Sequence, residues 1–327
     1  MSEALPRVSI GIPVYNGEAF LRDCLDSLLN QTFSDFELVI SDNASTDSTE
    51  TICREYAARD KRIRYYRNDH NIGPIVNFDR VFRLARGEYF KWAAHDDVCA
   101  PEWLERCVTV LDQNPQVSLC YTQMCVINPD GEILDHYHYD IHADEPNRAQ
   151  RFQNLMCVDH RRHSAIEIFG LMRRDMMLKI PPQGKYARGD SVFLARVALF
   201  GRFHEIPEFL FFNREHGNRS SRVASITIRS QTQVSRWLGV GPLPPTEWFD
   251  PAKLGKLTFP EWNLVREYAS SVNLLPLSFS ERLACYGAVG YWFIRHIPKL
   301  VRDLLIAGEL ILRAVLRGGS NRKLASS

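Results

Sequence analysis

A regular alternation of short apolar strands and amphipathic helices over the first third of the chain is the feature that most constrains the fold. Residues 7–12, 36–41, 63–67 and 88–94 have the composition and length of buried strands. Between them, apolar residues recur at helical spacing, for example in 20–29. Strands and helices that alternate at this pitch form βαβ units with right-handed crossovers. The sequence therefore predicts an α/β fold with a mostly parallel sheet.

Polar residues gather directly after three of these strands. The three clusters are 13–16, 41–43 and 95–97. In open parallel sheets, ligands bind at the carboxyl ends of the strands, because neighbouring strands end at the same edge. The three clusters therefore predict one shared binding site.

The third cluster, His95-Asp96-Asp97, contains two adjacent carboxylates. Two such groups side by side repel each other, and a bound cation neutralises them. Carboxylate oxygens suit Mg²⁺ or Mn²⁺, and these ions also bind phosphate oxygens. The alternative interpretation is that the two acids cap the helix that Pro101 is expected to open.

The second half is predicted to be less regular than the first. Strands are expected at 117–127, 132–139, 164–173 and 203–212, and helices at 151–158, 190–199 and 279–316. Residues 239–260 are rich in Pro and Trp and are expected to form an extended connector. We therefore expect a domain at 1–225, with halves at 1–110 and 111–225, followed by a linker and helical region at 226–327.

Composition excludes some classes of partner. The 40 Lys and Arg residues nearly balance the 39 Asp and Glu residues, so no overall field attracts nucleic acid. None of the eight cysteines forms a C-x-x-C pair, which is typical of reduced core thiols in a cytoplasmic protein. The N-terminus has no signal-peptide pattern, and no apolar run is long enough for a clear membrane span. We expect a cytoplasmic protein.

Residues 1–110 closely resemble the inverting family-2 glycosyltransferases. The matching stretches are Val8–Asn16, Ser27–Asp47, Asn71–Gly73 and Gly87–Asp97, in the order and spacing of that family. The resemblance is strong as far as Asp97 and looser as far as Arg219, and it leaves out the C-terminal third. It implies the GT-A fold, which is a Rossmann-like, mostly parallel sheet with helices on both faces. Here a C-terminal helical extension would follow that fold.

The resemblance also implies a nucleotide site. The residues it marks as nucleotide-binding are Pro13, Tyr15, Asn16, Asp42, Asn43, Asn71 and Asp96. A carboxylate at Asp42 can accept a hydrogen bond from the imide N–H of uracil or from amino groups of other bases, and Tyr15 offers a ring on which a base can stack. The alternatives are that Asp42 caps a loop and that Tyr15 is a packing residue.

By the same resemblance, Asp97 is the direct ligand of Mn²⁺ or Mg²⁺, while Asp96 lies nearer the ribose or the donor sugar. His95 stands where the first acid of a full Asp-x-Asp motif would be, and it could be a weak ligand, a donor contact or a core residue. His216 could be a further metal ligand or a diphosphate donor. Arg214 and Arg219 could hold phosphate. The alternative for this second group is a solvated polar loop.

Inverting transfer also needs a carboxylate that removes the proton of the acceptor hydroxyl as the new bond forms. The family places this base at the start of a helix, often in a pair of acids, and Arg188-Gly189-Asp190 has that context. Gly189 replaces the first acid of the pair, Arg188 is a candidate donor or acceptor contact, and Asp190 could instead be an N-cap. Asp175 is the second candidate for the base. Residues 159–163 are a weaker candidate for acceptor or phosphate contact.

The predicted helix at 280–317 is apolar on one side and carries several basic residues. It is explained most simply by a packed helix pair, but Tyr291–Ile294 beside basic side chains also suits a helix at a membrane surface.

Together with the residues above, the family resemblance implies a metal-dependent enzyme that transfers a sugar from a UDP-linked donor to a glycan or lipid-linked acceptor of the cell envelope. It would be cytoplasmic or peripheral on the inner membrane face. The alternatives are a non-catalytic sugar-nucleotide or glycan-binding scaffold and a nucleotidyltransferase.

Overall fold

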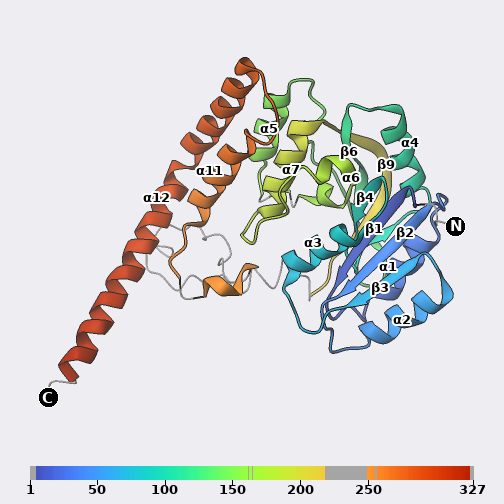
Figure 1. Cartoon of the computed structure of the whole chain (residues 1–327), viewed down its shortest axis with the longest axis horizontal. Helices are drawn as coiled ribbons and strands as arrows, with labels where there is room; N and C mark the ends of the chain where they lie inside the picture. Colours follow the sequence, from blue (N-terminus) through green and yellow to red (C-terminus); the bar gives the residue numbers. More distant parts are fainter. Residues whose placement is uncertain (1–4, 161, 164, 218–248, 255, 325–327) are drawn as a thin grey trace.

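The computed structural model describes residues 5–324 apart from 161, 164, 218–248 and 255. Within these residues nine strands form one sheet in the order β3-β2-β1-β4-β8-β6-β9-β5, with β7 paired to β6. Helices cover both faces of the sheet, and two further helices lie beside it (Figure 1). The predicted α/β architecture with a C-terminal helical extension is confirmed.

The N-terminal half is the predicted series of βαβ units. Its elements are β1 (Val8–Val14), α1 (Leu21–Leu29), β2 (Phe36–Asp42), α2 (Thr49–Arg59), β3 (Ile63–Arg67), α3 (Pro74–Leu84) and β4 (Tyr89–Trp92). All four strands run parallel. We expected Pro13 to end the first strand, but β1 continues through it. Strand β4 pairs with β1 only as far as Gly11. Pro13 has no N–H to donate, but at its position β4 offers no ladder partner that would need one.

The next elements correct two expectations. After β4 come β5 (Val98–Cys99), α4 (Trp103–Gln113), β6 (Val117–Ile127), β7 (Ile133–Tyr137) and α5 (Arg148–Met156). Pro101 does not open α4, whose N-cap is Glu102. The short strand β5 separates the two acids at 96 and 97 from this helix. They are therefore not its capping pair.

The remaining elements of the domain complete the sheet. They are η1 (Ile166–Phe169), β8 (Leu171–Arg173), α6 (Arg174–Met177), α7 (Gly189–Phe200) and β9 (Arg202–Arg214). The strand expected at 164–173 was wrong in its first part, because Ala165 has a left-handed backbone (φ 53°) and a 3₁₀ turn precedes the short β8.

Strand directions bring distant segments to one edge of the sheet. Strand β8 is antiparallel to both β4 and β6, and β9 is parallel to β6. The strands β6 and β9 therefore run in the same direction as β1, β2 and β4. The carboxyl end of β9 consequently lies at the same edge as the polar clusters that follow β1, β2 and β4, as the topology of open sheets requires for a shared site.

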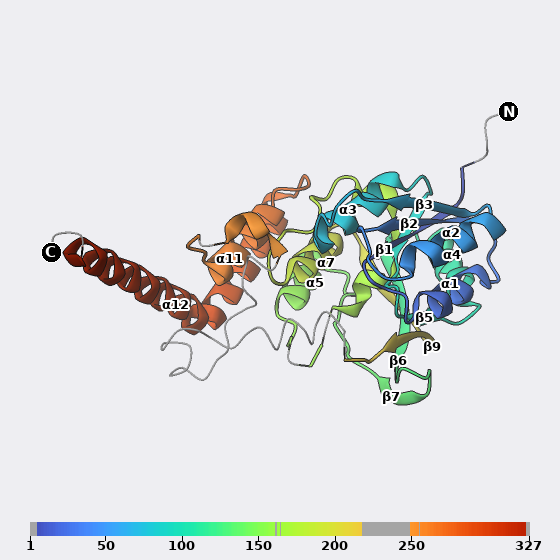
Figure 2. The ribbon, with the colours of Figure 1, turned by 90° about the horizontal axis from the view of Figure 1, so that it is seen from below.

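The C-terminal region is a pair of helices, α11 (Pro260–Ser271) and α12 (Phe279–Leu324), preceded by the short 3₁₀ helix η2 (Pro251–Lys253). Both views show α12 beside α11 and running on away from the sheet (Figures 1 and 2). Trp292 on α12 is buried and stacks on His296, with 3.9 Å between ring centroids. None of the helices in the described ranges has the length and apolar character needed to cross a membrane. The expected domain boundary at 225 falls in 218–248, outside the described residues.

Candidate active site

The two adjacent acids after β4 have different partners. Asp97 is 5% exposed and lies opposite Asn213, because the β5–β9 pairing joins Val98 to Phe212. The side-chain amide of Asn213 donates to both oxygens of Asp97, at 3.0 and 3.1 Å, and the backbone N–H of Arg214 donates to Oδ1 at 2.9 Å. Asp97 thus fastens the end of β9 to the end of β4.

Asp96 instead meets the histidine that follows β9. Its Oδ2 lies 2.9 Å from Nε2 of His216, and the His216 ring packs on Phe20 with centroids 4.8 Å apart. The expectation that Asp97 binds a metal and Asp96 lies nearer the ribose stays a prediction, and these partners are the geometry against which it is weighed. Asp96 and His216 converge on one point, whereas Asp97 is held by groups of the protein.

Arg214 connects the site to two other segments. Its guanidinium donates to the backbone oxygen of Asp96 at 3.0 Å, to Oδ2 of Asp23 at 3.0 Å and to the backbone oxygen of Pro129 at 2.6 Å. The Arg214 side chain is 3% exposed, and its guanidinium, which the sequence analysis expected to bind phosphate, is bonded to these protein groups instead. Arg214 is therefore a positioning residue in this structure. Arg219, its predicted companion, lies outside the described residues.

His95 is partly buried beside the site and packs on the loop after β1. Burial lowers its pKa below the ordinary value of 6.5, so the ring is neutral at neutral pH. A Cβ placed on Gly17 would lie 2.7 Å from Cδ2 of His95, which shows how closely the loop after β1 packs on this ring. Of the three interpretations of His95, the packing one agrees with its position.

The loops after β1 and β2 are tied together. Asn16 adopts a left-handed backbone (φ 50°), and its N–H donates to the hydroxyl of Ser45 at 2.9 Å. Its side-chain oxygen accepts from the N–H of Thr46 at 2.8 Å. Next to this bridge Tyr15 is 45% exposed, although Pro13 is buried within β1. The exposed ring of Tyr15 is available for stacking.

Asp42 is fully buried at the end of β2. Its oxygens accept from the N–H of Ser45 at 2.8 Å, from the hydroxyl of Tyr65 at 2.9 Å and from the guanidinium of Arg67. Asp42 thus holds the loop after β2 in place, and Arg67 reinforces it by donating to the backbone oxygen of Ser45 at 2.9 Å. Arg67 was not among the predicted site residues, although its place at the end of β3 was a signal that could have found it.

Asn43 organises the neighbouring loop. Its side-chain NH₂ donates to Asn71 at 2.9 Å, and its oxygen accepts from Asn68 at 3.0 Å and from the N–H of Ile72 at 2.9 Å. The three predicted residues Asp42, Asn43 and Asn71 therefore belong to one polar network at the carboxyl end of β2.

Asp190 lies in the first turn of α7. Its Oδ1 accepts from the N–H of Ser191 at 2.8 Å, while the N-cap is Arg188 in a left-handed conformation (φ 66°). Burial raises the pKa of Asp190 above its ordinary value of 3.8, and the charge of Arg188 opposes that shift. One turn later, Phe193 packs edge-on against Trp92, the last residue of β4, with ring centroids 5.5 Å apart. The first turn of α7 is thus fixed near the strand that leads to Asp96.

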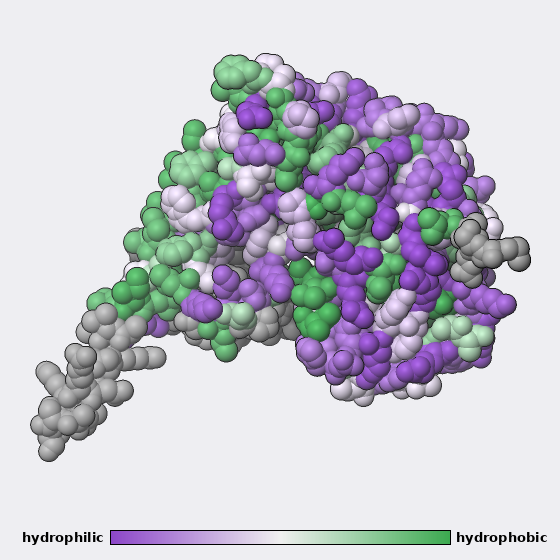
Figure 3. All heavy atoms as spheres, in the orientation of Figure 1, coloured by the Kyte–Doolittle hydropathy of each residue, from purple (hydrophilic) through white to green (hydrophobic). Residues whose placement is uncertain are grey.

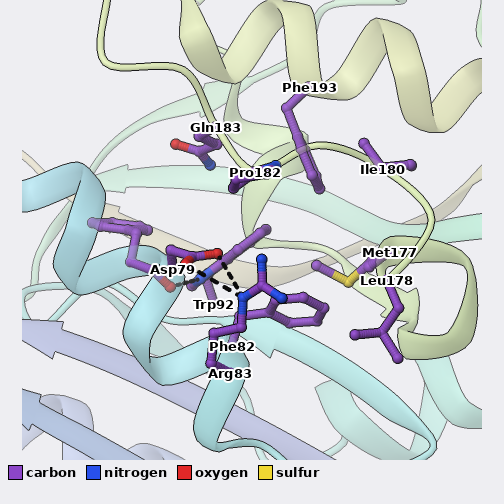
Figure 4. A pocket seen from close by; sticks show the side chains of 11 residues that line it. Asp79, Phe82, Arg83, Trp92, Met177, Leu178, Ile180, Pro182, Gln183 and Phe193 are labelled. Carbon is purple, nitrogen blue, oxygen red and sulfur yellow. Dashed lines mark hydrogen bonds and ion pairs between the residues drawn. The ribbon is translucent and has the colours of Figure 1, made fainter. Parts of the chain in front are cut away.

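A pocket opens between α3, the end of β4 and the segment that leads into α7. It encloses about 380 Å³, including the part open to solvent, and the Trp92 and Phe193 rings form one side of it (Figure 4). The Asp79–Arg83 ion pair and Gln183 provide polar groups at its wall. An aromatic pocket with a few polar groups is the usual composition of a small-molecule site.

Two weaker candidates do not join the site. Asp175 is 76% exposed and pairs with Lys179 at 3.5 Å, so it lacks the shielded environment of Asp190. His163 is buried, with Nδ1 at 2.7 Å from the hydroxyl of Tyr137 and Nε2 at 2.9 Å from Glu167. Both of its ring nitrogens therefore have partners within the protein, and position 161 of the same stretch lies outside the described residues.

Comparison with known proteins identifies the family of this chain. The sequence model of Glycosyl transferase family 2 matches residues 9–180, which is more than half of the chain. The chain belongs to glycosyl transferase family 2. It is 27% identical to an uncharacterized glycosyltransferase of Haemophilus influenzae over 224 residues, covering 68% of this chain and 69% of that protein. It is 33% identical to chondroitin synthase of Escherichia coli over 206 residues, covering 59% of this chain and 29% of that protein.

The fold of this family-2 glycosyltransferase also matches solved structures. The crystal structure of S. aureus TarS 1-349 in complex with UDP-GlcNAc superposes with a TM-score of 0.52 at 15% identity, covering 83% of this chain and 82% of that one. The predicted GT-A fold is confirmed. The sequence analysis missed Asn213 and Asp23, which hold Asp97 and Arg214. A polar residue beside Arg214 at the end of a strand was the only signal for Asn213.

Proposed function

We propose that this family-2 glycosyltransferase transfers a sugar from a UDP-linked donor to a hydroxyl of a glycan or lipid-linked acceptor in the cell envelope, with inversion. The observation that carries the proposal is the convergence of Asp96 and His216 at the sheet edge where the Tyr15 and Asp42 loops also end. The Tyr15 ring could stack on a base, and the polar loop after β2 could bind the ribose. The carboxylate–imidazole pair could hold a metal ion that binds the diphosphate.

The donor set at Asp96 and His216 suits a divalent ion. A carboxylate oxygen and an imidazole nitrogen 2.9 Å apart fit Mn²⁺, and Mg²⁺ would rely mainly on the carboxylate. Within the described ranges, no group of three or more His, Cys, Asp or Glu side chains forms a complete metal site. Diphosphate oxygens and water would supply the other ligands. When bound, such an ion offsets negative charge on the leaving diphosphate. We therefore assign this role to Asp96 rather than Asp97.

Asp190 is the proposed base. In a single displacement the acceptor oxygen forms a bond to the anomeric carbon as the bond from that carbon to the diphosphate breaks, and the acceptor proton passes to the carboxylate of Asp190. Burial raises the pKa of Asp190, which makes this carboxylate a stronger base than an exposed one.

Release of UDP from UDP-sugars in the presence of Mn²⁺ tests the proposal. We expect Asp96→Ala and His216→Ala each to lower the rate about a hundredfold or more, since both would weaken charge stabilisation of the leaving group. The matched control is Asp130→Ala, which removes an exposed carboxylate from the β6–β7 turn. Near-native rates in EDTA would refute the metal role. Saturable binding of UDP-sugars without any release would instead favour the binding-scaffold alternative.

A further inference from the structure

The long helix α12 turns an apolar face to solvent. Leu283, Ile294, Val301, Leu305 and Leu312 on this helix are between 47% and 66% exposed. Their spacings of four, seven and eleven residues place them on one side of the helix. Figure 3 shows this hydrophobic surface along the flank formed by α12, whereas the surface over the sheet is mainly hydrophilic. Outward-facing residues of a helix on a soluble domain are normally polar.

The opposite face of the same helix already has a partner. Cys285, Ala288, Trp292 and Leu300 are buried there, where α12 packs on α5 and α11. Trp292, which the sequence suggested as a membrane-facing residue, is therefore part of the core. The exposed apolar face is additional to the packing face, so the stability of the helix pair does not explain it.

The charges around the apolar face have one predominant sign. From Phe279 to the C-terminus the sequence contains eight Lys and Arg residues but three Asp and Glu residues, although the whole chain has 40 and 39. Arg302 and Asp303 are both buried and lie 3.8 Å apart, and Glu309 pairs with Arg313, so leaving out these two pairs six basic residues remain against one acid, Glu281. The exposed side chains of Arg282 and Arg295 lie toward opposite edges of the apolar face. The combination is complementary to an anionic, apolar surface.

We propose that α12 docks this enzyme on an anionic lipid bilayer, with its apolar face in the acyl–headgroup boundary and its basic residues on the headgroups. A second copy of the chain fits the same face less well. Helix seams between copies are flanked by charges of opposite sign. Here both edges are basic, so two copies would place like charges together. The inference rests on the surface of α12 and not on the proposed chemistry.

Sedimentation with vesicles tests the docking. We expect the full chain to bind vesicles of phosphatidylcholine and phosphatidylglycerol more tightly than vesicles of phosphatidylcholine alone. The double variant Ile294→Ser/Leu305→Ser should bind at least about tenfold more weakly, because two large apolar side chains no longer enter the bilayer. The variant Arg282→Ala/Arg295→Ala should lose about fivefold or more, and only on the anionic vesicles.

The matched control removes equally exposed apolar side chains from another surface. Ile133 and Leu134 on β7 are 52% and 59% exposed, and Ile133→Ser/Leu134→Ser should leave vesicle binding unchanged. An equal loss in this control, or no binding of the full chain to either vesicle, would overturn the proposal. A dimer in the absence of lipid that Ile294→Ser/Leu305→Ser dissociates would also overturn it and assign the face to a second copy.

A local probe gives an independent measurement. A polarity-sensitive dye on Ile294→Cys should shift its emission to shorter wavelength when anionic vesicles are added, and the same dye on Ile133→Cys should not. Seven of the eight native cysteines are buried, and Cys157 is partly so, which limits labelling elsewhere. Identical spectra for the two labelled positions would contradict the proposed orientation. Neither readout depends on sugar transfer, so failure of the proposed chemistry would leave the docking result interpretable.

Discussion

The sheet edge and the C-terminal helices place polar and apolar groups in opposite ways. At the edge, the carboxylates of Asp42 and Asp97 are buried, and each accepts several hydrogen bonds. On α12, apolar side chains such as Ile294 lie in solvent while the charged pair Arg302–Asp303 is inside. Buried polar groups need internal partners, and a large exposed apolar patch indicates a surface that meets something else.

The difference separates two kinds of site. At the sheet edge the buried polar groups have their hydrogen-bond partners within the chain, so they hold the loops in place before any donor binds. The exposed face of α12 is not completed within the described residues. We infer that the first region is arranged for chemistry and the second for attachment, and the following predictions test that division in order of decreasing effect.

The largest expected effect follows Asp190→Asn. Removal of the base should lower turnover about a hundredfold or more while leaving donor affinity unchanged. The rate of the unmodified enzyme should rise with pH through a pKa above the ordinary aspartate value, because burial raises the pKa of Asp190 and the base must be ionised. Turnover, donor affinity and the pH–rate profile are the measurements.

Asp175→Asn is the control for that experiment, since Asp175 is exposed on α6 and should be dispensable. If Asp190→Asn kept full turnover, Asp190 would not be the base. If Asp175→Asn lost it, the second candidate would replace the first.

The next effect distinguishes the two adjacent acids. Asp97→Ala should lower the free energy of unfolding by about 2–4 kcal/mol, because the amide of Asn213 and the N–H of Arg214 would lose a buried acceptor. Asp96→Ala should cost less stability, since Asp96 has one side-chain partner, but it should cost more of the metal-dependent rate. Denaturant unfolding of both variants measures this. Equal stability of the two variants would contradict the division of roles.

The smallest expected effect concerns the C-terminal helices. Burial raises the pKa of Asp303 from 3.8 to about 6. The hydrogen bond from the N–H of Glu261 and the charge of Arg302 lower this pKa, but by less than burial raises it. Between these pH values the folded chain keeps a proton on Asp303 that the unfolded chain releases, so the contribution of Asp303 to the free energy of unfolding should fall as pH rises from about 4 to about 6. Allowing for solvent screening, we expect about 1–2 kcal/mol.

Asp303→Asn should remove most of that pH dependence, as measured by denaturant unfolding at several pH values. The control Asp130→Asn, on an exposed turn, should retain it. A slope that persists in Asp303→Asn would mean that another group of the chain titrates in this range.

Much of the fold could be predicted from the sequence because the signals are local. Apolar runs of strand length predicted β1 to β4, and apolar residues at helical spacing predicted the helices between them. The alternation of strands and helices predicted the parallel sheet. The polar residues after β1, β2 and β4 marked the edge at which the candidate site lies. The family resemblance supplied the GT-A fold, which the family match and the fold comparison bear out.

The hydrogen-bond partners of Asp96 and Asp97 could not be predicted, because they depend on strand pairing across the chain. Asn213 lies 116 residues from Asp97, and only the β5–β9 register brings them together. The two-residue strand β5 is too short to give a periodic signal. Helical periodicity showed that α12 is amphipathic, but the two apolar sides of this helix could be separated only after its packing face was known.

The arginine at the end of β9 has a consequence for protein engineering. Arg214 contacts Asp96, Asp23 and Pro129, which belong to three different stretches of the chain. A chimera that takes the segment from β6 to the end of β9 and the turn after it from a related enzyme would replace Arg214, Asn213 and His216 together. In such a hybrid the foreign residues at these three positions would face the strand ends of this chain. The three original residues would therefore have to be restored for the contacts with Asp96, Asp97 and Asp23 to form.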